Sequence, residues 1–123
     1  MKNKLPQLIA LFLLIQGISL KAFSFTTVEV KDSISSDTHW TCDKQYLLHG
    51  YVYVTNNSTV TIDPGVIVKG DKNSKGSLIV ERGSKLIAVG TPTEPIVFTS
   101  NQPVGQRSYG DWGGVILCGK APN

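Results

Sequence analysis

The sequence is poor in the residues on which metal sites, redox sites and nucleic-acid-binding surfaces depend. Its 123 residues include two cysteines, two histidines and one methionine, and only 17% are charged. Hydrophobic residues make up 41%, which excludes an intrinsically disordered chain, because disorder requires low hydrophobicity and high net charge. The length allows one domain at most. We therefore expect a single globular unit.

No hydrophobic run is long enough to cross a membrane as a helix. The longest, Leu8–Leu20, is a mostly apolar run of 13 residues, whereas a spanning helix needs about 20. A short positive segment precedes it, and the small residues Ala22 and Ser24 follow it, as at a signal-peptide cleavage site. Residues 1–24 are therefore predicted to be a signal peptide.

The formal charge of +3 belongs wholly to this first segment. Lys2, Lys4 and Lys21 are its charged residues, which leaves nine basic and nine acidic side chains in the rest of the chain. The remainder is formally neutral, so no nucleic-acid partner is expected. The late position of Lys21 leaves an uncleaved anchor as the alternative to a mature start at Phe25. Either way we expect export, to the extracellular medium or the cell surface.

From Tyr46 onward the chain reads as short strands and turns, with almost no helical pattern. Apolar runs rich in Val, Ile, Tyr and Phe are separated by Gly, Pro, Asn, Asp and Ser. The candidate strands are Tyr46–Val54, Thr59–Ile62, Val66–Lys69, Leu78–Val80, Leu86–Val89, Ile96–Thr99 and Val115–Cys118. The candidate turns are Asn56–Asn57, Asp63–Gly65, Arg82–Gly83 and Gly90–Pro92. An all-β fold follows.

A repeat runs through these strands. Thr59–Gly65 resembles Ser77–Gly83 at an offset of 18 residues, and the strands that follow them close on Gly70 and Gly90 at an offset of 20. A period near 20 with two or three short strands fits a β-solenoid, in which each repeat is one coil stacked on its neighbour. Alternation then predicts three inward-facing pairs: Val60 with Ile62, Leu78 with Val80, and Ile96 with Phe98. Thr61, Asp63 and Glu81 are predicted to face water.

The ends of a solenoid expose unpaired backbone groups and an apolar core face. Residues 25–45 are less periodic and contain Trp40, so we expect them to form an N-terminal cap, with the first coils in residues 46–123. No corresponding cap follows the last predicted strand. The open edge at Val115–Cys118 is therefore expected to pair with further coils or to drive self-association.

Several motifs occur in the same order as in a known family. They are Trp40, Tyr46–Val54, Thr59–Gly70, Leu78–Ala88, Gly90–Thr91, Pro95–Ser100 and Gly110–Val115. Together they resemble the N-terminal part of secreted bacterial surface proteins with a right-handed parallel β-helix of the pectate-lyase-like fold. The resemblance implies that fold with an N-terminal cap, and a chain truncated at its C-terminus. In that family more coils usually follow, sometimes with an outer-membrane export or sorting domain.

The acidic residues do not form the set that an enzyme of this fold would need. Pectate-lyase-like relatives use clustered Asp with calcium and a basic residue on one strand face. Here Asp63, Asp71, Glu81 and Asp111 are scattered, and Asp63 and Glu81 occupy equivalent turn positions. No dense acidic run offers the six to eight oxygens that calcium takes. We expect no catalytic residue, no resident metal and no cofactor.

The four residues most able to bind zinc are His39, Cys42, His49 and Cys118. Their spacing matches no zinc pattern, so an ordinary histidine and thiol are favoured. A disulfide between the two cysteines is opposed by distance: about three coils, each rising roughly 4.8 Å, separate them, whereas bridged Cα atoms lie within about 7 Å. We expect free thiols, or pairing with cysteines elsewhere.

The Gly-rich interval Gly105–Gly114 is the candidate ligand-binding segment. Tyr109 and Trp112 offer ring faces, and Arg107 and Asp111 offer hydrogen bonds, a combination suited to a carbohydrate. The structural alternative is that Trp112 packs over a coil corner and the glycines permit a sharp turn. A phosphate loop is excluded, because no helix and no Gly-Lys-Ser ending follow.

The sequence favours a non-enzymatic function. We expect an exported or cell-surface β-helix module that supports adhesion or contacts a glycan or surface polymer. The alternative is the N-terminal fragment of a polysaccharide-acting lyase or hydrolase whose catalytic coils are missing. A fold of this kind does not distinguish the two, because one fold carries many functions.

Overall fold

The computed structural model describes residues 25–120, which form ten β-strands and no helix. The strands are β1 (Thr26–Val30), β2 (Thr38–Trp40), β3 (Lys44–Leu48), β4 (Tyr51–Val54), β5 (Thr59–Ile62), β6 (Ile67–Gly70), β7 (Ser77–Val80), β8 (Lys85–Ala88), β9 (Val97–Ser100) and β10 (Gly114–Leu117). The predicted signal peptide, residues 1–24, lies outside the described residues. Within them, no helix long and apolar enough to cross a membrane occurs.

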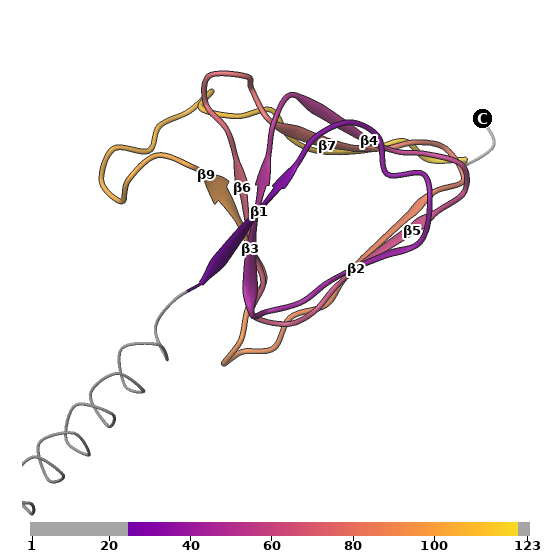
Figure 1. The fold of residues 1–123 in the computed structure, drawn as a ribbon, viewed down its shortest axis with the longest axis horizontal. Coiled ribbons are helices and arrows are strands. Elements are labelled where there is room, and N and C mark those ends of the chain that lie inside the picture. Colours follow the sequence, from indigo (N-terminus) through magenta and orange to yellow (C-terminus); the bar gives the residue numbers. More distant parts are fainter. Residues whose placement is uncertain (1–24, 121–123) are drawn as a thin grey trace, which may run out of the picture.

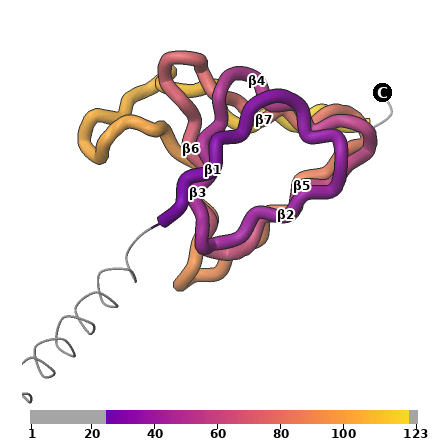
Figure 2. Tube along the Cα trace, viewed as in Figure 1, coloured from indigo at the N-terminus to yellow at the C-terminus, as the bar shows by residue number. Residues whose placement is uncertain are grey.

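The strands build three parallel sheets around one axis (Figures 1 and 2). Sheet A has the order β1-β3-β6-β9, sheet B the order β4-β7-β10 and sheet C the order β2-β5-β8. Every strand pair is parallel, so each turn of the chain lies directly on the previous one. This is the right-handed parallel β-helix that the sequence predicted.

The strand predictions from Thr59 onward are confirmed to within one residue at each end. The predicted strand Tyr46–Val54 is wrong as a single element, because it divides into β3 and β4 at Gly50, whose φ of 64° turns the chain between sheets A and B. The sequence missed β1 and β2 entirely. Their alternation is weak, and only pairing with the next coil makes them strands.

The predicted repeat of 18 to 20 residues is also wrong. Thr59 lies opposite Lys85 in sheet C, and Ser77 lies opposite Tyr51 in sheet B, both 26 residues apart. The two segments that look alike in sequence therefore belong to different sheets. Each coil turns three corners, and similar strand-and-glycine patterns recur at successive corners rather than once per coil.

The core is the column of inward-facing side chains. Val60, Ile62, Leu78 and Val80 are buried, as the alternation predicted. Phe98 faces inward as well but is only half-buried, because it belongs to the last coil of the described residues and nothing in them covers it. Burial along the axis therefore decreases from the middle coils toward this end.

The segment expected as an N-terminal cap, residues 25–45, is itself coiled. β1 pairs with β3, and β2 pairs with β5. Trp40 is buried and stacks on Tyr46 with ring centroids 4.6 Å apart and an interplanar angle of 17°. This aromatic pair adds attraction beyond its buried area. The capping role of the segment stays a prediction.

Candidate functional site

The long connection between β9 and β10, residues 101–113, projects from one corner of the β-helix (Figure 1). Together with β9 it forms an open groove of about 560 Å³. The groove is lined by Phe98, Thr99, Ser100, Arg107, Ser108, Tyr109 and Trp112. Three of the four predicted ligand-binding residues thus line one surface feature, which we call the corner groove.

The two aromatic residues of the corner groove differ in how they are held. Tyr109 is fully exposed, and its ring is free to meet a ligand. Trp112 is half-buried and lies against Gly70, where an added Cβ would come within 2.5 Å of Trp112 Cβ and Cε3. Trp112 therefore packs over a coil corner and lines the groove at the same time. Both sequence interpretations of this residue describe part of its position.

Arg107 closes one side of the loop. Its Nε donates a hydrogen bond to the backbone carbonyl of Gln102 at 2.8 Å. This contact positions the guanidinium beside the groove, and the terminal nitrogens remain as donors in a planar fork. A hydroxyl or carboxylate ligand would suit that fork.

Asp111 does not line the groove, which corrects its predicted place in the binding set. Its side chain is 1% exposed and accepts hydrogen bonds from Ser108 N at 3.0 Å, Ser108 Oγ at 3.1 Å and Ser100 Oγ at 2.8 Å. Lys72 Nζ lies 3.8 Å from the same carboxylate. A buried carboxylate needs such partners. Asp111 therefore organises the loop that carries Arg107 and Tyr109.

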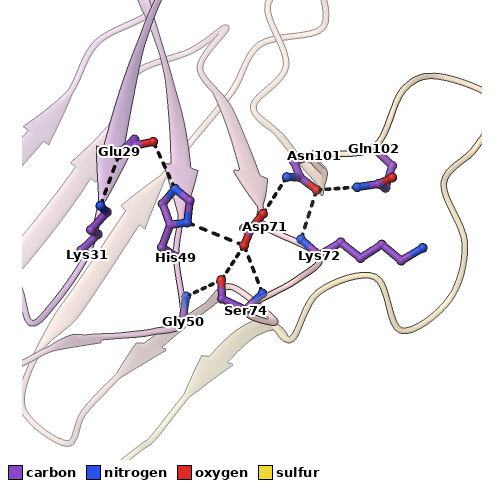
Figure 3. Close-up of polar contacts among 9 residues, drawn as sticks. All are labelled: Glu29, Lys31, His49, Gly50, Asp71, Lys72, Ser74, Asn101 and Gln102. Atoms are coloured by element: carbon purple, nitrogen blue, oxygen red, sulfur yellow. Dashed lines mark hydrogen bonds and ion pairs between the residues drawn. The ribbon is translucent and has the colours of Figure 1, made fainter.

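A second polar arrangement, which the sequence did not reveal, holds the coils together at the same corner (Figure 3). His49, Asp71 and Asn101 each directly follow a strand of sheet A, so they stack in successive coils. Asn101 Nδ2 donates to Asp71 Oδ1 at 2.9 Å, and His49 Nδ1 lies 3.6 Å from Asp71 Oδ2. We call these three residues the corner ladder.

The corner ladder is anchored at both ends. Glu29 Oε1 lies 3.4 Å from His49 Nε2, which is otherwise buried without a hydrogen-bond partner. At the other end, Asn101 Oδ1 accepts hydrogen bonds from Lys72 N at 3.1 Å and Gln102 Nε2 at 3.1 Å. Because Gln102 is also the residue that Arg107 contacts, the ladder links the first coil to the corner groove. Only the stacking register could have shown this.

The carboxyl groups of Asp111 and Asp71 should make the fold sensitive to acid. Hydrogen bonds from Ser108 lower the pKa of Asp111 below its ordinary value of 3.8, and hydrogen bonds from Ser74 do the same for the pKa of Asp71. The unfolded chain takes up these protons more readily than the folded chain. Their contribution to stability is therefore complete above about pH 4 and is lost as the pH falls through the lowered pKa values.

We accordingly expect the melting temperature to fall as the pH is lowered from about 4, with a smaller decrease in Asp111→Asn than in the unmodified chain. Circular dichroism melts at a series of pH values measure this difference. The amide keeps an acceptor oxygen for Ser108 but cannot titrate. An identical acid dependence in both proteins would contradict the role given to Asp111.

The histidines and cysteines do not come together. His39 Nε2 lies 2.6 Å from Asp63 Oδ1 on sheet C, beside a shallow polar hollow, whereas His49 belongs to the corner ladder. Cys42 and Cys118 are both exposed and free. Among residues 25–120, no group of three potential metal ligands is close enough to hold an ion.

The fold and its corner define a class: three-sided parallel β-helices that carry a projecting loop on one corner. Within this class the chain belongs to the family described as the pectate-lyase-like β-helix domain, whose family model matches residues 32–123. The resemblance seen in the sequence is thereby confirmed. Comparisons with curated proteins and with solved structures gave no match.

Proposed function

We propose that this protein is an exported, non-enzymatic β-helix module that contacts a glycan through the corner groove. Export is supported by the signal-peptide pattern of residues 1–24. Glycan contact is supported by an exposed ring and a fixed ring at one open surface, with a guanidinium between them in sequence. Sugar rings present C–H faces to aromatic rings and hydroxyls to charged donors.

The observation that carries the proposal is the contrast between Tyr109 and Trp112. A fully exposed tyrosine that packs on nothing gives no stability to the fold, whereas Trp112 supplies a floor already held in place by Gly70. A preorganised surface loses less entropy on binding than a flexible one. The groove is open rather than enclosed, so it suits a segment of polymer better than a small molecule.

We expect Tyr109→Ala to weaken glycan binding by about tenfold, or 1.4 kcal/mol, without changing the melting temperature. A glycan array made with the exported chain identifies the ligand, and titration of the variant against that glycan measures the loss. Tyr51→Ala is the matched control, because Tyr51 is an exposed tyrosine of β4 outside the groove. It should bind as the unmodified chain does.

Equal binding by Tyr109→Ala and Tyr51→Ala would remove the corner groove as the glycan site. The same sample also tests the alternative of a polysaccharide-acting enzyme fragment. Chain cleavage, detected as new reducing or unsaturated ends on a bound polysaccharide, would support that alternative and contradict a purely binding role.

A further inference from the structure

The two ends of the β-helix expose strand edges that match each other. At one end of residues 25–120 the outermost strands of sheets A, B and C are β9, β10 and β8, and at the other end they are β1, β4 and β2. In sheet B, Ile34 bridges to Val54 beyond β4, so the first coil also contributes there. Each sheet therefore presents unpaired backbone groups at both ends.

The end formed by β8, β9 and β10 also exposes part of the apolar core. Leu117 occupies the same inward position as Val80 and Val54 in sheet B, since the three lie opposite one another in register. Val54 and Val80 are 0% and 3% exposed, whereas Leu117 is 67% exposed. An inward-facing leucine left in water is unfavourable by the free energy of its uncovered area.

The first coil is apolar at its own free face in the same way. Val28 faces inward opposite Tyr46, and Ile34 faces inward near Val54. Both are only partly buried, although they pack against the core. The two end faces thus share the same cross-section, because they are terminal layers of one column.

Charge is distributed unevenly between the two ends, although the chain from residue 25 onward is formally neutral. Residues 25–43 carry four acidic side chains and one lysine, a formal charge of −3. Residues 64–120, which hold β6 to β10, carry seven basic and four acidic side chains, a formal charge of +3. Two identical ends would repel, whereas opposite ends attract.

From these features we propose that copies of this protein associate head to tail, with the β8–β10 end of one copy stacked on the first coil of the next. The stack continues sheet A from β9 to β1 and sheet C from β8 to β2. It covers Leu117 and brings the basic end onto the acidic one. Because the two contacting surfaces differ, the contact is heterologous and propagates instead of closing as a dimer.

Analytical ultracentrifugation of the exported chain over a concentration series tests the proposal. Oligomers larger than dimers are expected to grow with concentration, and Leu117→Glu should weaken the association by at least about tenfold. Glutamate at this position removes the apolar contact and repels the acidic end. Val104→Glu is the matched control, since Val104 is an exposed apolar residue of the projecting loop and not of a strand edge. It should associate as the unmodified chain does.

A second variant, Glu29→Lys with Asp32→Asn, neutralises the acidic end at exposed positions, and asparagine tolerates the φ of 64° at residue 32. Each blocked protein alone should be mainly monomeric, and an equimolar mixture should form heterodimers through the two ends left intact. A monomeric unmodified chain at high concentration would overturn the proposal. So would association of Leu117→Glu at unchanged strength, or a mixture that stays monomeric. Circular dichroism of each variant confirms that it is folded.

Discussion

Leu78→Ala is expected to lower the free energy of unfolding by about 2–5 kcal/mol. Leu78 is fully buried in β7, the central strand of sheet B, where it lies between Val52 of β4 and Val115 of β10. Covered on both sides along the axis, the site has little freedom to collapse around the lost methyl groups. Chemical denaturation at low protein concentration measures the change.

The matched control is Leu117→Ala, the same substitution at an inward position of the same sheet. Because Leu117 is mostly exposed, its loss removes little buried area and should cost below about 1 kcal/mol. The contrast would show that position along the axis, rather than residue type, decides the contribution of a core leucine. Similar losses in both variants would contradict the burial gradient described for this β-helix.

Gly70→Ala is expected to destabilise the fold by about 1–3 kcal/mol and to weaken glycan binding. Its Cβ would come within 2.5 Å of Trp112 Cβ and Cε3, and a Cβ atom cannot swing aside as a flexible side-chain end can. Trp112 would then have to leave the coil corner, and the floor of the corner groove would move with it. Denaturation and titration with the bound glycan measure the two effects separately.

Gly105→Ala serves as the control for Gly70→Ala. Gly105 lies in the same loop region with open space around it, so an added methyl meets no neighbour. Its φ of 89° is unfavourable for alanine and should cost about 1 kcal/mol, without disturbing the groove. Unchanged glycan affinity in Gly70→Ala would show that Trp112 does not position the ligand.

Local features of this chain were predictable because they depend on neighbouring residues alone. The alternation at Val60 and Ile62 gave the inward face, and it is the buried face. The turn at Asn56–Asn57 was recognisable because asparagine accepts a positive φ, which both residues adopt at 59° and 55°. The aromatic and basic residues of the groove were recognisable from composition, since Arg107, Tyr109 and Trp112 are close in sequence.

Which coil lies on which was not predictable. Three sheets with similar local patterns make several alignments equally good, and the choice of Ser77 opposite Thr59 placed strands of two different sheets together. The corner ladder depends on that choice, because His49, Asp71 and Asn101 meet only in the correct stack. The buried position of Asp111 was likewise hidden, because its partner Ser100 belongs to another element.

By itself the sequence determined the class of this protein: a chain of short strands and turns, alternately apolar, with a signal-peptide pattern in front and no basic excess behind. Those properties follow from side-chain periodicity and composition. Only the tertiary structure decided the register of the coils, the separation of Asp111 from the groove, and the exposure of Leu117. Each of these depends on contacts between residues at least 11 positions apart, or on the absence of such contacts, and no local pattern encodes them.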